Sequence, residues 1–307
     1  AWTGGAGDGL WTTAGNWDLG HAPTVVETAA LGGGAVSVPS IVLAGDVTAS
    51  TGAALTFTGK SVSSVNIGTS AAVTLGAAAN DVAINYGTSG KINLPSAPTL
   101  NLNGTAYTVI TKLGAAGDET AGANTLQGLA NSGKLAGTYV LGADINAAAT
   151  SGWNSGAGIA PIGGGSDQFT GAVDGLGHAV NYLTVNLPSE LNVGLFGTQS
   201  IGSVTRNIGL TSAAVTGGQG VGALAGYSQG TVAGAWATGA VNGVTSYDGS
   251  SHVGGLIGRL DGAATEIHAD VVVTSEFGSG LVGGLIGGCN PCTLSATYAT
   301  GAVTGYE

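Results

Sequence analysis

Cys289 and Cys292 could take part in disulfide, redox or metal chemistry, and the sequence contains no other cysteines. Their Cys-Asn-Pro-Cys spacing is compatible with a short disulfide loop, a thioredoxin-type redox pair or half of a zinc site. A redox pair belongs at the start of a helix in a βαβ unit, and zinc would need two more ligands, for which only His252 and His268 are near in sequence. The spacing therefore favours a structural disulfide, which implies an oxidising, extracytoplasmic setting.

Two glycine-rich segments match signatures of catalysis or cofactor binding. Gly226-Tyr227-Ser228-Gln229-Gly230 fits the G-x-S-x-G nucleophile elbow, and residues 278–283 fit the G-x-G-x-x-G dinucleotide motif. The nucleophile elbow requires a strand-to-helix turn with His and acidic partners brought in by the fold. The dinucleotide motif requires a helix after it, but residues 284–287, Gly-Leu-Ile-Gly, form a helix poorly. Both segments also overlap copies of a repeated phrase. We interpret them as corners of a repeat and predict that the chain is not an enzyme.

Carboxylates are the other candidates for chemistry, because glycoside hydrolases place two of them across one bond. Here they are dispersed, and Asp174 lies in a turn phrase where it can cap backbone N–H groups. The histidines are isolated too, and we interpret each as a surface or turn residue. Stacked repeats can bring distant residues together, so a polysaccharide-active enzyme stays open as an alternative. The carboxylates considered are Asp144, Asp167, Asp174, Glu190, Asp248, Asp261, Glu266 and Asp270.

Composition narrows the class of protein. Glycine makes up 59 of 307 residues, 43% of residues are hydrophobic and only 7% are charged, which is typical of neither collagen nor a disordered chain. Six basic residues and a net charge of −11 could not neutralise a run of phosphates, so we expect no nucleic-acid partner. No apolar run approaches the ~18 residues of a spanning helix, so we expect no direct membrane insertion. No cofactor or metal site is indicated.

The elements that position these residues are set by a phrase that returns four times in the last third of the chain. Its third and fourth copies read Val-Gly-Gly-Leu-Ile-Gly, and the first valines of the four copies follow one another at nearly constant intervals. A second phrase, at residues 236–243, returns at residues 298–305. Such a period indicates one supersecondary unit stacked on its own copies. The expected repeat core is Val193, Leu195, Phe196, Val221, Leu224, Val253, Leu256, Ile257, Val282, Leu285 and Ile286.

The upstream sequence divides into three further parts. Residues 1–25 hold three of the five tryptophans among glycines, which indicates an opening coil or cap. Residues 26–106 alternate apolar and polar positions between turn formers, which predicts short strands with one buried face. Residues 107–190 continue this pattern with insertions and one short helix near 125–130, and residues 191–307 hold the repeats. We predict an all-β fold, a parallel β-solenoid with glycine-rich coil corners and roughly 25 residues in each of about twelve coils.

The repeated phrases at residues 253–258 and 282–287 resemble the GLUG motif of large secreted bacterial surface proteins. The segment from Tyr107-Thr108-Val109-Ile110 to Asp174-Gly175-Leu176-Gly177-His178 is similar to the stretch that leads into such repeats in filamentous-haemagglutinin-like exoproteins of two-partner secretion. The Trp-rich opening resembles a motif of autotransporter passengers. This resemblance implies a right-handed parallel β-helix, export across a Gram-negative outer membrane by a secretion partner in that membrane, and an adhesive or biofilm role. It implies no catalytic residue.

We therefore expect a secreted adhesin or biofilm-matrix module at the bacterial cell surface. Its partners would be a host receptor, a glycan or exopolysaccharide, or neighbouring copies. The interval before Val253 is the longest between copies of the phrase, and its extra residues, Thr245, Ser246, Tyr247 and Asp248, form the candidate contact loop. A self-assembling extracellular filament subunit is the other alternative, because an uncovered coil end exposes strand edges that can template stacking.

Overall fold

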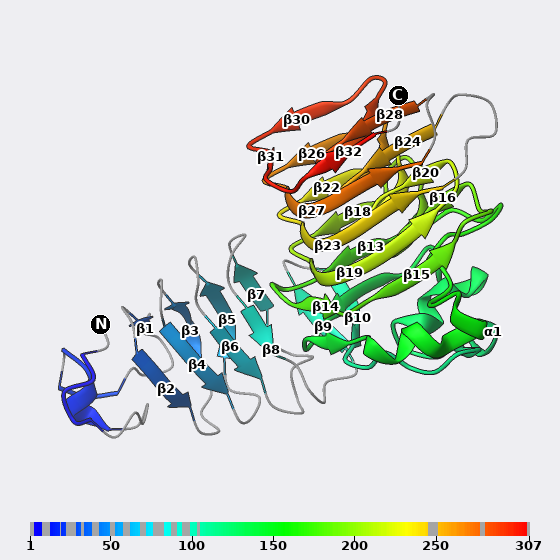
Figure 1. The fold of residues 1–307 in the computed structure, drawn as a ribbon. Helices are drawn as coiled ribbons and strands as arrows, with labels where there is room; N and C mark the ends of the chain where they lie inside the picture. Colours follow the sequence, from blue (N-terminus) through cyan, green and yellow to red (C-terminus); the bar gives the residue numbers. More distant parts are fainter. Residues whose placement is uncertain are drawn as a thin grey trace. The chain divides into compact units, whose positions relative to one another are not determined.

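The computed structural model describes residues 3–7, 13–18, 20–22, the strands between residues 29 and 102, and residues 105–244, 251–276 and 280–305. The chain forms two compact units (Figure 1). Both are built from parallel β-sheets with few helical residues, which confirms the expected all-β class. Unit 1 comprises Ala1–Thr111, Thr138–Ala143 and Leu176–His178, and unit 2 comprises Lys112–Gly137, Asp144–Gly175 and Ala179–Glu307.

Unit 1 contains two parallel sheets whose strands alternate along the chain. Ala29 pairs with Val47 and Val36 with Leu55, so one coil separates the two members of each pair. The period-two alternation of the sequence predicted strands in this region, and the structure has them. One sheet contains β1 (Ala29–Leu31), β3 (Leu43–Ala49), β5 (Val62–Ile67), β7 (Ala83–Tyr86) and β9 (Thr99–Leu102). The other contains β2 (Gly34–Val38), β4 (Ala53–Phe57), β6 (Ala72–Leu75) and β8 (Lys91–Asn93).

Unit 1 also holds a hairpin and a short 3-10 turn. Strand β10 (Thr105–Ile110) pairs antiparallel with β9 and parallel with β11 (Thr138–Leu141). The 3-10 helix η1 (Ala14–Asn16) precedes Trp17, which is buried. The amide side chain of Asn16 accepts a hydrogen bond from the Ala6 backbone N–H at 2.9 Å.

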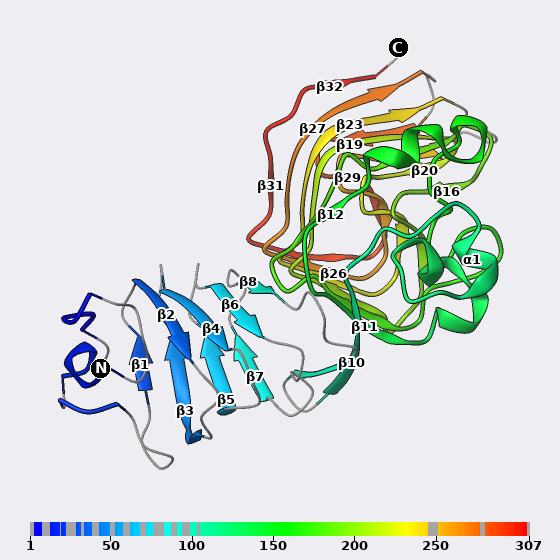
Figure 2. The same cartoon turned by 90° about the horizontal axis from the view of Figure 1, so that it is seen from below.

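Unit 2 winds through four parallel sheets, and Figure 2 shows its successive coils following nearly the same path. The first sheet contains β13 (Ala172–Asp174), β18 (Val204–Arg206), β22 (Thr231–Ala233), β26 (Ala263–Thr265) and β30 (Thr293–Ser295). The second contains β12 (Ile145–Asn146), β14 (Ala179–Asn181), β15 (Thr184–Leu187), β19 (Gly209–Gly217), β23 (Trp236–Gly243), β27 (His268–Ser275), β31 (Tyr298–Ala299) and β32 (Val303–Thr304). The third contains β16 (Asn192–Val193), β20 (Gly220–Val221), β24 (Ser251–Gly254) and β28 (Gly280–Gly283). The fourth contains β17 (Phe196–Gln199), β21 (Ala225–Ser228), β25 (Ile257–Leu260) and β29 (Ile286–Cys289).

The repeated phrase defines the register of unit 2. The first valines of its four copies pair in order, Val193 with Val221, Val221 with Val253 and Val253 with Val282. Each copy spans a corner, because it begins in the third sheet and ends in the fourth. The interpretation of residues 226–230 as a corner holds only for their end, because residues 226–228 lie in strand β21 and residues 229–230 connect it to β22. The chain also turns inside the phrase, at residues 223–224.

The single predicted coil length was also wrong. Coils of unit 1 are shorter than predicted, as the pairing of Val36 with Leu55 shows. Coils of unit 2 are longer, as in the pairings of Val204 with Thr231 and of Trp236 with His268. A single average coil length cannot describe both units, because the coils of unit 1 alternate between two sheets and the coils of unit 2 pass through four sheets.

Between residues 112 and 170 the chain leaves the sheet path in several places and forms short helices. The single helix expected near 125–130 is the 3-10 helix η3 (Gln127–Ala130), and the others were not expected. They are α1 (Asp118–Ala121), η4 (Ser132–Lys134) and η5 (Ala148–Gly156). Among the described residues, no helix has the length and apolar character needed to cross a membrane.

The core of unit 2 lies inside the coils. All members of the expected repeat core in the first three copies of the phrase are fully buried, and Phe196 packs against Phe169 with ring centroids 5.1 Å apart. In the fourth copy, Val282, Leu285 and Ile286 are only half-buried, because no further coil lies over them among the described residues. Burial of apolar area stabilises the stack by roughly 25 cal/mol per Å².

Candidate binding surface

The outer face of the second sheet of unit 2 carries the most ordered set of exposed side chains. Side chains alternate across a strand, so buried Ala237 and Val241 of β23 point inward while Trp236 and Thr238 point outward. The same alternation on β27 places Val271 inside. We call the outward residues of β23, β27 and β31 the ladder face, and define it as Trp236, Thr238, His268, Asp270, Val272 and Tyr298.

Three rings form a stack along this face. The centroids of Trp236 and His268 are 6.4 Å apart with planes inclined by 10°, and those of His268 and Tyr298 are 4.9 Å apart with planes inclined by 4°. The stack begins over Gly209 of β19, where an added Cβ would lie 2.3 Å from the indole Cε2 of Trp236. A glycine at this position is therefore what lets the indole lie flat against the preceding coil.

The ring faces inside the stack are turned toward one another, so the stack offers a ligand its ring edges and the outer side of Tyr298, which is 57% exposed. Beside the rings, Thr238 lies in register with the exposed carboxylate of Asp270, and Val272 is 51% exposed. Aromatic carbon and hydrogen-bonding oxygens on one rigid surface are the groups that contact both the apolar and the hydroxyl parts of a sugar.

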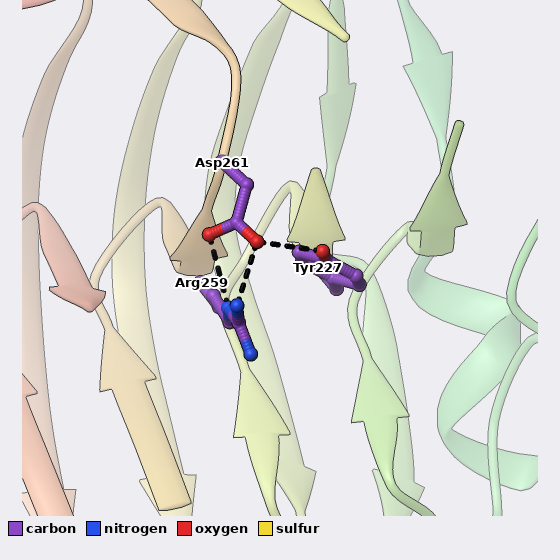
Figure 3. A network of polar contacts seen from close by, with 3 residues as sticks. All are labelled: Tyr227, Arg259 and Asp261. Atoms are coloured by element: carbon purple, nitrogen blue, oxygen red, sulfur yellow. Dashed lines mark hydrogen bonds and ion pairs between the residues drawn. The ribbon is translucent and has the colours of Figure 1, made fainter. Parts of the chain in front are cut away.

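A second polar cluster lies on the fourth sheet (Figure 3). Tyr227 of β21 and Arg259 of β25 are register partners, and the guanidinium carbon lies 5.1 Å from the centroid of the tyrosine ring. Asp261 accepts hydrogen bonds from Arg259 Nε at 3.0 Å, from Arg259 Nη2 at 2.7 Å and from the Tyr227 hydroxyl at 2.7 Å. One carboxylate thus fixes two neighbouring coils through a bidentate ion pair and a phenol.

Ionisation of the three groups is coupled. Burial raises the pKa of the Tyr227 phenol, and its hydrogen bond to Asp261 raises it further. Burial by itself would raise the pKa of the Asp261 carboxyl, but the hydrogen bonds from Arg259 and Tyr227 outweigh burial and hold that pKa below its usual value. The hydrogen bond to Asp261 raises the pKa of Arg259. The cluster is therefore stable as an ion pair with a neutral phenol at neutral pH.

Cys289 and Cys292 are joined by a disulfide between β29 and β30. The pair lies in a turn between two strands, which is not the helix start that a thioredoxin-type site requires. A shallow depression of about 380 Å³ beside it is lined by Cys292, Pro291, Asp261 and Gln229 among others. The disulfide closes the corner of the fourth coil next to the Tyr227–Arg259–Asp261 cluster.

The described residues of the two literal sequence motifs lie mainly in strands. Ser228 of the G-x-S-x-G match lies in β21, is fully buried, and is followed by strand β22. Part of the G-x-G-x-x-G match, residues 278–279, lies outside the described residues, and its later residues form β28. The candidate contact loop Thr245, Ser246, Tyr247 and Asp248 also lies outside the described residues.

Several side chains have partners that the sequence did not reveal. Asp174 is buried in β13, where it accepts hydrogen bonds from Arg206 Nε at 2.6 Å and Asn207 Nδ2 at 3.2 Å. His178 is buried rather than on the surface, and His268 is a member of the ring stack. A signal for the stack was present, because Trp236 and Tyr298 begin the two copies of the second phrase.

The described carboxylates and histidines are not assembled into a metal site, since no group of three or more His, Cys, Asp or Glu in the described part of the chain has suitable geometry. Asp144 accepts a hydrogen bond from the Ala179 N–H at 3.0 Å, and Asp261 binds Arg259.

Comparison with known proteins finds one partial relative. Over 139 residues, 44% of this chain, the sequence is 42% identical to the protein named Halomucin from the archaeon Haloquadratum walsbyi. The chain spans about 2% of the length of that relative. No protein-family model matches the chain, and no solved structure matches it. The likeness to GLUG repeats and filamentous-haemagglutinin-like exoproteins therefore stays a prediction from the motifs, and the chain is similar to a short part of Halomucin.

Proposed function

We propose that this chain is a structural and adhesive module of an extracellular surface protein, and that it binds glycans along the ladder face. The observation that carries this proposal is the ladder face itself, where stacked rings, a threonine hydroxyl and the Asp270 carboxylate lie in register on a rigid sheet. The disulfide and the partial likeness to Halomucin support a location outside the cell. A right-handed winding of the coils is part of the proposal, because connections between parallel strands of one sheet are right-handed in about 98% of cases.

The proposal does not include export across a Gram-negative outer membrane or a secretion partner in that membrane. The partial relative comes from an archaeon, so the comparison gives a Gram-negative origin no support. The adhesive role does not depend on that route, because it follows from the exposed ladder face and from a stack that holds this face rigid.

Binding to purified polysaccharides tests the proposal, with neutral and acidic polymers immobilised in parallel. Replacing Asp270 with Asn removes the carboxylate and keeps the shape, and we expect binding to weaken about fivefold, equivalent to ~1 kcal/mol. Asp167→Asn is the matched control, because Asp167 is exposed and lies outside the ladder face. The proposal is wrong if no polymer binds, or if both variants weaken binding equally.

A further inference from the structure

A cavity of about 330 Å³ lies in unit 2 where the chain departs from the repeat. Three segments surround it: the α1–η3 region, the turn after η5, and the loop between β15 and β16. This volume is near the lower end of the range of roughly 300 to 1,000 Å³ typical of small-molecule sites. Its walls come from residues that the repeated phrases do not include. The lining residues used below are Glu119, Asn154, Pro161, Leu187, Glu190 and Asn192.

The wall formed by the turn after η5 is held in place by specific contacts. Asn154 has a left-handed backbone with φ of 51°, and its side-chain Nδ2 donates a hydrogen bond to the Gly158 carbonyl at 2.9 Å. Gly158 lies against β15, where an added Cβ would be 2.1 Å from the Thr184 carbonyl oxygen. The Ala160 N–H donates to the buried Gln127 Oε1 at 3.0 Å, which ties this turn to η3. The cavity is therefore preformed.

The polar groups of the lining are mainly hydrogen-bond acceptors. Glu119 uses one carboxylate oxygen to accept from the Gly117 N–H at 3.1 Å, and the carboxylate of Glu190 makes no hydrogen bond or ion pair with the described residues. Asn154 and Asn192 use their amide nitrogens as donors, the latter to Thr198 Oγ1 at 3.1 Å. The amide oxygen of Asn192 lies against Gly220, so Asn154 is the residue whose amide oxygen is left as an acceptor. No Lys, Arg or His is present among the described residues that line the cavity.

We propose that this cavity binds a small organic amine. An ammonium group has three N–H donors and one positive charge, which complement the two carboxylates and the amide oxygen of Asn154. Pro161 and Leu187 supply an apolar wall for the carbon part of the ligand. The site is separate from the ladder face, so this proposal and the glycan-binding proposal stand or fall independently.

Titration calorimetry of the intact chain at low ionic strength tests this inference with cadaverine as the probe. We expect cadaverine to bind and its neutral counterpart 1,5-pentanediol not to bind. Glucosamine and N-acetylglucosamine form a second pair, which shows whether an amino sugar or a linear amine is the better ligand. Equal binding of cadaverine and pentanediol would overturn the proposal.

Variants locate the binding. Glu190→Gln and Glu119→Gln each remove one charge from the cavity, and we expect each to weaken cadaverine binding about fivefold or more. Glu276→Gln is the matched control, because Glu276 is exposed at the end of β27 and glutamine can still accept the hydrogen bond from Asn242. A similar loss in all three variants would mean that cadaverine binds only through the overall negative charge, and the proposal would then be wrong. Asp270→Asn should leave cadaverine binding unchanged.

Discussion

Arg259 shows how single residues join neighbouring coils of this protein. It stacks on Tyr227 of the preceding coil and forms a bidentate ion pair with Asp261 after its own strand. From the sequence alone, Asp261 is one of several dispersed carboxylates. The spacing between Tyr227 and Arg259 indicates a contact only once the register of β21 and β25 is known. Close neighbours along the chain, such as Arg259 and Asp261, also give no distinctive sequence signal.

The Asp261 cluster predicts a pH dependence of stability. The folded-state pKa of Asp261 is lowered, so its contribution is complete above about pH 5 and disappears as the pH falls below ~3.9 through the folded-state value. Because Arg259 is more than a third exposed, we expect Asp261→Asn to lower the free energy of unfolding by no more than ~1 kcal/mol at pH 7. Urea unfolding of both proteins at pH 7 and pH 2.5 measures this difference.

The difference between wild type and Asp261→Asn should be smaller at pH 2.5 than at pH 7, because the lowered pKa of Asp261 makes its contribution decrease as the pH falls. An equal difference at both pH values would show that Asp261 acts through shape rather than charge. Asp167→Asn controls for the loss of one surface charge.

At the scale of the elements, glycines set how closely the coils approach. The last glycine of a phrase packs against the first valine of the preceding copy: an added Cβ would lie 2.3 Å from the Val193 nitrogen at Gly226 and 2.5 Å from the Val221 nitrogen at Gly258. Neither glycine has a positive φ. The glycine at the end of each phrase thus reflects close backbone approach, with no need for a left-handed conformation.

Replacing Gly258 with Ala should destabilise unit 2. The added methyl group would overlap the Val221 nitrogen and the Gly226 carbonyl oxygen, and overpacking of this kind costs about 1–3 kcal/mol or more. Gly152→Ala is the control, since its Cβ would meet no atom within 4 Å and its φ is not positive, so we expect a change below ~0.5 kcal/mol. Chemical denaturation of the two variants measures both values, and equal stability would contradict the role given to Gly258.

The sequence predicted the elements of the repeat region better than their contacts. Spacing between the valines of the phrase matches the pairing of Val193, Val221, Val253 and Val282, because the side chains that fill the coil recur with its length. Corners were missed because strands and turns both contain glycine here. The ring contacts were missed because the middle ring, His268, lies between the two copies of the second phrase and begins no copy of its own. The short helices between residues 112 and 170 have no periodic pattern at all.

At the scale of the whole molecule, the two units differ in the number of residues that form one coil. A coil of unit 1 runs from Val36 to its partner Leu55, whereas a coil of unit 2 takes the longer path from Val204 to Thr231. A longer coil encloses more side chains per layer, and both Phe169 and Phe196 are buried inside unit 2. The strands of unit 2 pair in parallel register throughout its four sheets.

The parallel register of unit 2 also fixes the spacing between side chains that lie in one row across its strands. Thr216, Asn242, Thr274 and Thr304 occupy one row across β19, β23, β27 and β32, although the intervening chain lengths differ. Backbone hydrogen bonds set the pitch of such a row at ~4.8 Å. Four identical substitutions would therefore produce a line of chemical groups at a fixed atomic spacing, a template on which the ions of a mineral lattice could be ordered.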